Sequence, residues 1–187
     1  LRRPSKQQFV SSFPSNNFAI KKENFKKLNG FPIERNFYAE DLEFSINAAS
    51  KFKAFWDPNI KVSHHFHTSL KKYLKQQYRF ARDTIRVYKR NNWFKDLIKN
   101  KNTYQGGKNK ITIALTALSL FLSILSIINF KMLYALLLLP LTTLIDADIF
   151  ITFLKEKRLI YVIYSLPMLI LRNLSWVIGM VIGIFKK

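Results

Sequence analysis

The fold of this chain is decided by residues 111–128, which read ITIALTALSLFLSILSII and contain no charged residue. A run of 18 residues is about the minimum for a helix that crosses the hydrocarbon core of a bilayer. Two further apolar runs follow, at residues 132–154 and 159–185, separated by the polar loop 155–158. A chain of 187 residues cannot bury three such runs in one soluble core. We therefore expect residues 111–187 to be a transmembrane region with two to three helices.

The charges are distributed unevenly along the chain and predict its orientation. Residues 1–110 carry 24 Lys and Arg against 8 Asp and Glu, whereas residues 111–187 carry 7 against 3. The positive-inside rule places the basic part and the loop 155–158 on the same cytoplasmic face, so the first two runs must both cross. We expect an integral membrane protein whose soluble part is cytoplasmic. The third run either spans or lies along the interface, and Arg172 near its middle has Asp146 or Asp148 as candidate partners.

The part before the membrane divides into residues 1–67 and a basic region, residues 68–110. Helical spacing predicts a short helix over residues 39–49, and β-forming residues predict strands at 52–56 and 60–63. The basic region holds 13 Lys and Arg and predicts an amphipathic helix that an anionic leaflet would attract. The chain contains no Cys, which excludes disulfides and thiol catalysis. Because its first residue is Leu and not Met, we expect it to be part of a longer protein.

Three groups of residues are candidates for chemistry. Glu40 and Asp41 stand at a helix start, where the helix dipole favours the ionised carboxylate that a general base needs. Gln76 and Arg79 lie one helical turn apart, where both side chains can hold one polar ligand. His64 belongs to a histidine cluster that is a candidate metal site. Each has an ordinary alternative, because first-turn acids, polar helix faces and surface histidines are common without any catalytic role. The pair Asp146 and Asp148 lies inside an apolar run, so we do not interpret it as a metal-binding motif.

The order of five short motifs along residues 16–90 adds to these signals. They are, in chain order, Asn17-Phe18-Ala19-Ile20-Lys21-Lys22, Asn29-Gly30-Phe31, Glu40-Asp41, Asp57-Pro58 with Val62-Ser63-His64, and Gln76-Gln77-Tyr78-Arg79-Phe80. This succession resembles the C-terminal half of the family 2 glycosyltransferases, and the similarity resumes at residues 172–179. The resemblance implies an α/β fold: the acceptor half of a Rossmann-like GT-A glycosyltransferase domain over residues 1–67, followed by C-terminal transmembrane helices.

The resemblance also implies roles for single residues. Asp41 matches the general base that deprotonates the acceptor hydroxyl, and Glu40 matches its partner. His64 matches a histidine that helps some relatives bind the metal or the donor diphosphate, and a divalent Mg or Mn cofactor is implied. Phe80 stands where the membrane-bound synthases carry a Trp, which favours a single transfer over a processive polymerase. The positions that match the acceptor side of the cleft are Asn17, Lys21, Gly30, Gln76 and Arg79.

The resemblance thus implies an inverting transferase that moves a sugar from a nucleotide-sugar donor to a hydroxyl acceptor at the cytoplasmic membrane face. Lipid-linked acceptors and cell-envelope glycans are the acceptor classes that a membrane anchor favours. The donor-binding half and its Asp-x-Asp motif have no counterpart before residue 16, so we expect the fragment to be inactive alone. The alternative is a non-catalytic membrane protein that binds anionic lipid or a protein partner through its basic helix. We expect no nucleic-acid partner, because the membrane tether explains the basic charge more economically.

Overall fold

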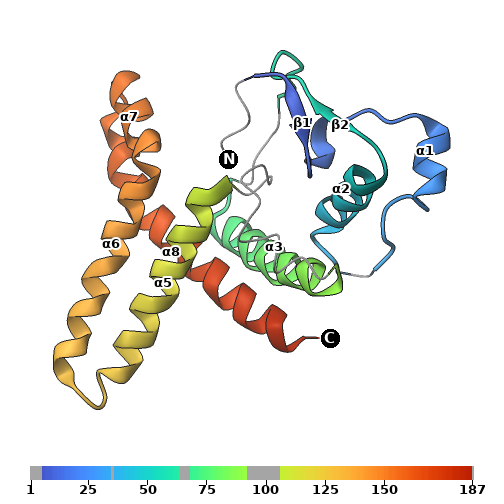
Figure 1. Ribbon diagram of the computed structural model, residues 1–187. Coiled ribbons are helices and arrows are strands. Elements are labelled where there is room, and N and C mark those ends of the chain that lie inside the picture. The colour runs from blue at the N-terminus through green and yellow to red at the C-terminus, as the bar shows by residue number, and fades with distance from the viewer. Residues whose placement is uncertain (1–5, 35, 64–67, 92–105, 187) are drawn as a thin grey trace.

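A computed structural model describes residues 6–34, 36–63, 68–91 and 106–186 of the chain (Figure 1). The protein is mostly helical, with 70% of it in helices. Residues 6–91 form what we call the basic layer, whose elements are β1 (Gln8–Val10), η1 (Ser15–Asn17), α1 (Lys22–Lys27), α2 (Glu40–Lys51), β2 (Ala54–Trp56) and α3 (Leu70–Arg90). Residues 106–186 form the apolar region, with α5 (Gly106–Leu125), η2 (Phe130–Leu137), α6 (Leu138–Thr143), η3 (Leu144–Asp146), α7 (Ala147–Lys155) and α8 (Leu159–Phe185).

The predicted α/β fold, a partial Rossmann-like GT-A domain, is wrong. In the described ranges the strands are β1 and β2, which pair antiparallel with Gln8 opposite Trp56 and form a two-stranded ribbon. A Rossmann-like fold needs several parallel strands with helices on both faces. Residues 60–63, which we expected to be a strand, have no regular structure. The chain turns just before them, where the Asn59 N–H donates to Asp57 Oδ1 at 2.9 Å, and no strand among the described residues pairs with them.

The two helices predicted in the basic part are confirmed as α2 and α3, and together they build the main core. Leu42 and Ile46 on α2 pack against Ile85 and Tyr88 on α3, and all four side chains are buried. A second cluster fills the space between α1 and α2 with aromatic rings. Its buried residues are Leu28, Phe44 and Ala48, and its half-buried members are Phe13, Phe18, Ile20, Phe25, Phe31 and Phe52.

The apolar region contains two helical runs long and apolar enough to cross a membrane, Leu133–Lys155 and Leu159–Phe185, which supports membrane association. The first run combines η2, α6, η3 and α7. A shorter apolar helix, Ile111–Leu125, forms most of α5. α5 and the first run form an antiparallel hairpin (Figure 1), and Ser119 Oγ donates to the carbonyl of Ala135 at 2.6 Å across it.

The C-terminal part of α8 leaves this hairpin and runs beneath α3 (Figure 1). Trp176 Nε1 donates to Gln77 Oε1 at 2.8 Å near the middle of the contact. Lys89 Nζ donates to the carbonyl of Ile184 at 2.7 Å near its end. Because both residue numbers rise together, α3 and α8 are parallel.

Candidate functional site

The loop before α2 is tied to α3 by a buried carboxylate. Asp83 on α3 is 0% exposed and accepts a hydrogen bond from the Tyr38 N–H at 2.9 Å. Its two oxygens also accept from Arg82 Nε and Nη2 at 2.8 and 2.7 Å, and Arg86 Nη1 lies 3.3 Å away. Arg82 in turn donates to the carbonyl of Asn36 at 2.9 Å. Hydrogen bonds between ions and buried neighbours are among the stronger ones in proteins, so this network fixes the start of α2 relative to α3.

A second ion-pair cluster holds the same loop one turn further along α3. Arg86 Nη2 donates to Glu34 Oε1 at 2.5 Å, and Arg90 Nη2 donates to Glu34 Oε2 at 2.7 Å. Arg90 also reaches Glu43 on α2 at 3.4 Å. The hydrogen bond from Arg90 is the main reason why the pKa of Glu34 lies below its ordinary value. The arginines of α3 therefore hold both the loop and α2 in place.

Glu40 and Asp41 form the first turn of α2, as the sequence predicted. One oxygen of Asp41 accepts from the Leu42 N–H at 2.8 Å, and the other lies 3.4 Å from both the N–H and the hydroxyl of Ser15. Glu40 Oε2 is buried and has no hydrogen-bond partner among the residues that the structure describes. Burial raises the pKa of Glu40, and the negative charges of Asp41 and Asp83 act in the same direction. The two neighbouring carboxyl groups thus have different surroundings.

Among the residues predicted from the sequence, Arg79 lies near this turn. Its guanidinium group stacks 4.7 Å from the ring centroid of Tyr38 and donates to the Tyr38 hydroxyl. Tyr38 lies two residues before Glu40, so Arg79 and the acid pair are linked through one short loop. Gln76, one turn earlier on α3, is exposed. It is available to a ligand, as Arg79 is by its remaining N–H groups.

The other predicted residues have structural roles or lie apart. Asn17 Nδ2 donates to the carbonyl of Ile60 at 3.0 Å and so holds the segment after β2. Gly30 has a φ of +67°, a conformation that favours glycine, at the turn after α1. Lys21 is exposed at the N-cap of α1. His64 lies outside the described residues. Within the described ranges no three His, Asp or Glu side chains are grouped as metal ligands would be.

Several residues that organise this site were not singled out from the sequence. Asp83 is one, and the signal was its position as a lone acid in a strongly basic helix, where a carboxylate tends to pair. Tyr38 and Glu34 carry no such signal, because loop residues near a helix start have no periodicity. Gly179 and Gly183, four residues apart on α8, carry the small-residue spacing of close helix contacts.

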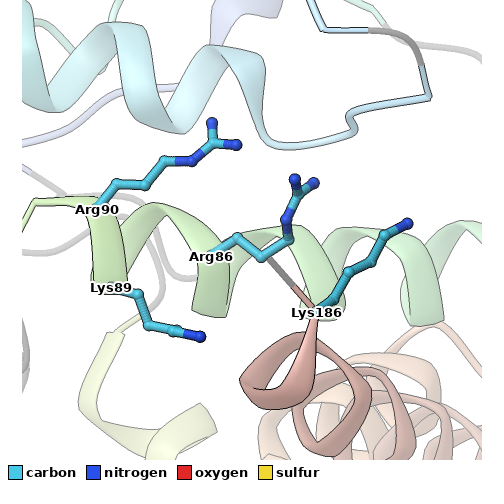
Figure 2. A pocket seen from close by; sticks show the side chains of 4 residues that line it. All are labelled: Arg86, Lys89, Arg90 and Lys186. Atoms are coloured by element: carbon cyan, nitrogen blue, oxygen red, sulfur yellow. The ribbon is translucent and has the colours of Figure 1, made fainter.

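Figure 2 shows a small hollow of about 110 Å³ where α3 and the end of α8 meet, lined by Arg86, Lys89, Arg90 and Lys186. Arg86, Arg90 and Lys186 point upward in this view, and Lys89 points downward. Arg86 and Arg90 donate to Glu34, and Lys89 donates to the carbonyl of Ile184. The hollow is therefore bounded by aliphatic stems, and the arginines are already engaged by carboxylates.

Comparison with known proteins adds no relative, because no family model, no curated protein and no solved structure matches the chain.

Proposed function

We propose that this chain forms the acceptor side of a membrane-bound inverting glycosyltransferase, with Asp41 as the general base. The observation that carries the proposal is the placement of the Glu40–Asp41 turn. It is the first turn of α2. The loop directly before it is fixed to α3 by Asp83 and its arginines. Chemistry on a membrane-linked acceptor needs a base that is held rigidly beside the membrane-associated part of the protein. We propose that the reaction takes place on the cytoplasmic side of the membrane, where nucleotide sugars are available.

The reaction is a direct displacement. The acceptor hydroxyl attacks the anomeric carbon of the nucleotide sugar, Asp41 takes the hydroxyl proton, and the nucleoside diphosphate leaves with the electron pair of the broken bond. Configuration at the anomeric carbon inverts. The N-terminal end of α2 favours the ionised form of Asp41. General-base assistance contributes roughly 10²–10⁴ in rate. Arg79, held by Tyr38, and the exposed Gln76 would orient the acceptor. The described residues supply no metal-ligand group, and we assign none of them to a metal.

The test is sugar transfer by membranes that carry the protein expressed with its natural flanking coding sequence. Membranes are incubated with labelled nucleotide sugars, and transfer to the lipid fraction and to soluble acceptors is counted separately. We expect Asp41→Asn to reduce transfer by roughly 10²-fold or more at an unchanged protein level. Glu23→Gln is the matched control, because Glu23 is also a first-turn acid but is exposed on α1. Equal activity in Asp41→Asn and the control would refute the proposal.

A second candidate function, membrane binding without catalysis, is favoured by the charge surplus and by the exposed lysines of α3. Lys71, Lys72 and Lys75 are all exposed near its start. Each cation near an anionic leaflet contributes about 1 kcal/mol. Under this function Asp41→Asn changes nothing, whereas replacing the three lysines by Gln weakens binding to anionic vesicles.

A further inference from the structure

We propose that α8 from Arg172 to Phe185 is a membrane-surface helix and not a third span. In this arrangement α3 holds it on one side, and the lipids of the leaflet nearest the basic layer bind it on the other. The proposal concerns the protein's contact with the membrane, and it does not depend on the transferase activity. It rests on the α3–α8 contact, on the charges of α3 and on the apolar outer face of α8.

The contact between α3 and α8 is close enough to involve the backbones. A Cβ added at Gly179 would lie 2.3 Å from the carbonyl oxygen of Tyr78, and one at Gly183 would lie 2.3 Å from that of Arg82. Only glycine permits such an approach. Phe80 packs against Trp176 with 5.6 Å between ring centroids. These contacts follow α8 over most of its C-terminal half, so α8 cannot change direction there without leaving α3.

The composition of α3 shows that this pair cannot lie across the bilayer. α3 carries eight Lys and Arg and one Asp over 21 residues. Placing a charged residue at the centre of a membrane helix costs about 2.5–3.5 kcal/mol even on the most permissive scale. If α8 crossed the membrane while in contact with α3, several of these charges would enter the hydrocarbon. The contact with α3 and a transmembrane path for the C-terminal half of α8 are therefore mutually exclusive.

Arg172 marks the level at which α8 meets the basic layer. Its Nη2 donates to Asp146 Oδ2 on η3 at 2.6 Å. α8 passes the Leu133–Lys155 run at this contact and continues from there along α3.

The outer face of α8 is what the lipid would bind. Its exposed apolar residues lie at helical spacing, three and four residues apart, and they are Ile178, Val181, Ile182, Ile184 and Phe185. The residues in contact with α3, Trp176, Gly179 and Gly183, occupy the opposite face. A helix with an apolar face of this kind inserts it about 5–10 Å into the boundary between headgroups and acyl chains. The surplus of cations in the basic layer selects an anionic phospholipid surface.

The test uses the natural absence of cysteine, which allows single reporters to be introduced into the whole chain. Lys186→Cys reports the end of α8, Glu23→Cys reports the basic layer, and Ile127→Cys reports the turn after α5. Each variant is expressed in sealed vesicles of one orientation and treated with a membrane-impermeant maleimide, before and after the vesicles are disrupted. We expect Lys186→Cys and Glu23→Cys to be labelled from one side and Ile127→Cys from the other.

Two labelling outcomes would overturn the proposal. Labelling of Lys186→Cys from the same side as Ile127→Cys would show that α8 crosses the membrane. Labelling of Glu23→Cys and Ile127→Cys from one side would show that α5 does not cross, so the hairpin would not span the bilayer on whose surface α8 is placed.

A depth measurement gives an independent readout. Leu171 lies near the centre of the Leu159–Phe185 run, so a fluorophore on Leu171→Cys would sit deep in the bilayer if the run spanned it. The vesicles contain phosphatidylglycerol and lipids brominated either near the headgroup or at the chain end. We expect several-fold stronger quenching by the bromine near the headgroup. Stronger quenching by the chain-end bromine would overturn the proposal.

Discussion

Replacing Asp83 by Asn tests whether one buried carboxylate holds the loop before α2 in place. The substitution keeps the size of the side chain and one oxygen acceptor, but it removes the negative charge. Arg82 and Arg86, whose side chains are 11% and 7% exposed, would lose their shared partner. Breaking a buried ion pair from one side costs about 3–5 kcal/mol. Because Arg86 retains Glu34, we expect the lower end of that range, about 3 kcal/mol, which corresponds to roughly a hundredfold change in an opening equilibrium.

Amide hydrogen exchange of the protein in lipid vesicles measures this opening locally. We expect the amides of α2 to exchange roughly a hundredfold faster in Asp83→Asn than in the parent chain. Glu23→Gln is the control, because Glu23 is exposed and its replacement should change stability by no more than about 0.5 kcal/mol. Equal protection of α2 in the two variants would mean that Asp83 does not fix the loop, and the rigid placement of Glu40–Asp41 would lose its physical basis.

Four further outcomes are expected. The folded pKa of Glu34 is lowered, so its contribution to stability is present above the ordinary value of 4.5 and is lost as pH falls through the folded pKa, which exchange of α2 against pH would detect. The folded pKa of Glu40 is raised, so its charge disfavours folding at neutral pH, and Glu40→Gln should raise the melting temperature in detergent at pH 7. Arg172→Leu should lower that temperature more than the double replacement of Arg172 and Asp146 by Leu, because the single change leaves a carboxylate unpaired. Gly183→Ala must move α8 by about 1 Å and should cost about 1–3 kcal/mol, seen as faster exchange in α3.

The local elements of this fold could be predicted because their signals are local. Leu42 and Ile46 stand at helical spacing, which predicts α2 from the sequence alone. The apolar runs can likewise be identified from their length and their lack of charge. The strand at 60–63 was predicted wrongly for the opposite reason, since a strand needs a neighbour, and propensity does not supply one.

The arrangement of the candidate site could be predicted only in part. Glu40 and Asp41 were identified from their position at a helix start, and the structure confirms that position. Their link to Arg79 runs through Tyr38, and the loop is fixed by Asp83, which is 45 residues distant in the chain. Pairings over such separations depend on the tertiary fold and leave no periodic pattern. The apolar side of α3 was recognised, but nothing near it in the sequence shows that α8 covers it.

The union of α3 with α8 also sets an order of events during protein synthesis. Gln77 and Trp176 are 99 residues apart, so the ribosome completes α3 well before it makes the helix that covers it. At about 5–20 residues per second, this interval lasts roughly 5–20 s. During that time the apolar side of α3 faces water, the membrane surface or a chaperone. The amphipathic composition of α3 suits the membrane surface. The nascent α3 can bind lipid there until α8 has been synthesised and replaces that lipid on its apolar side.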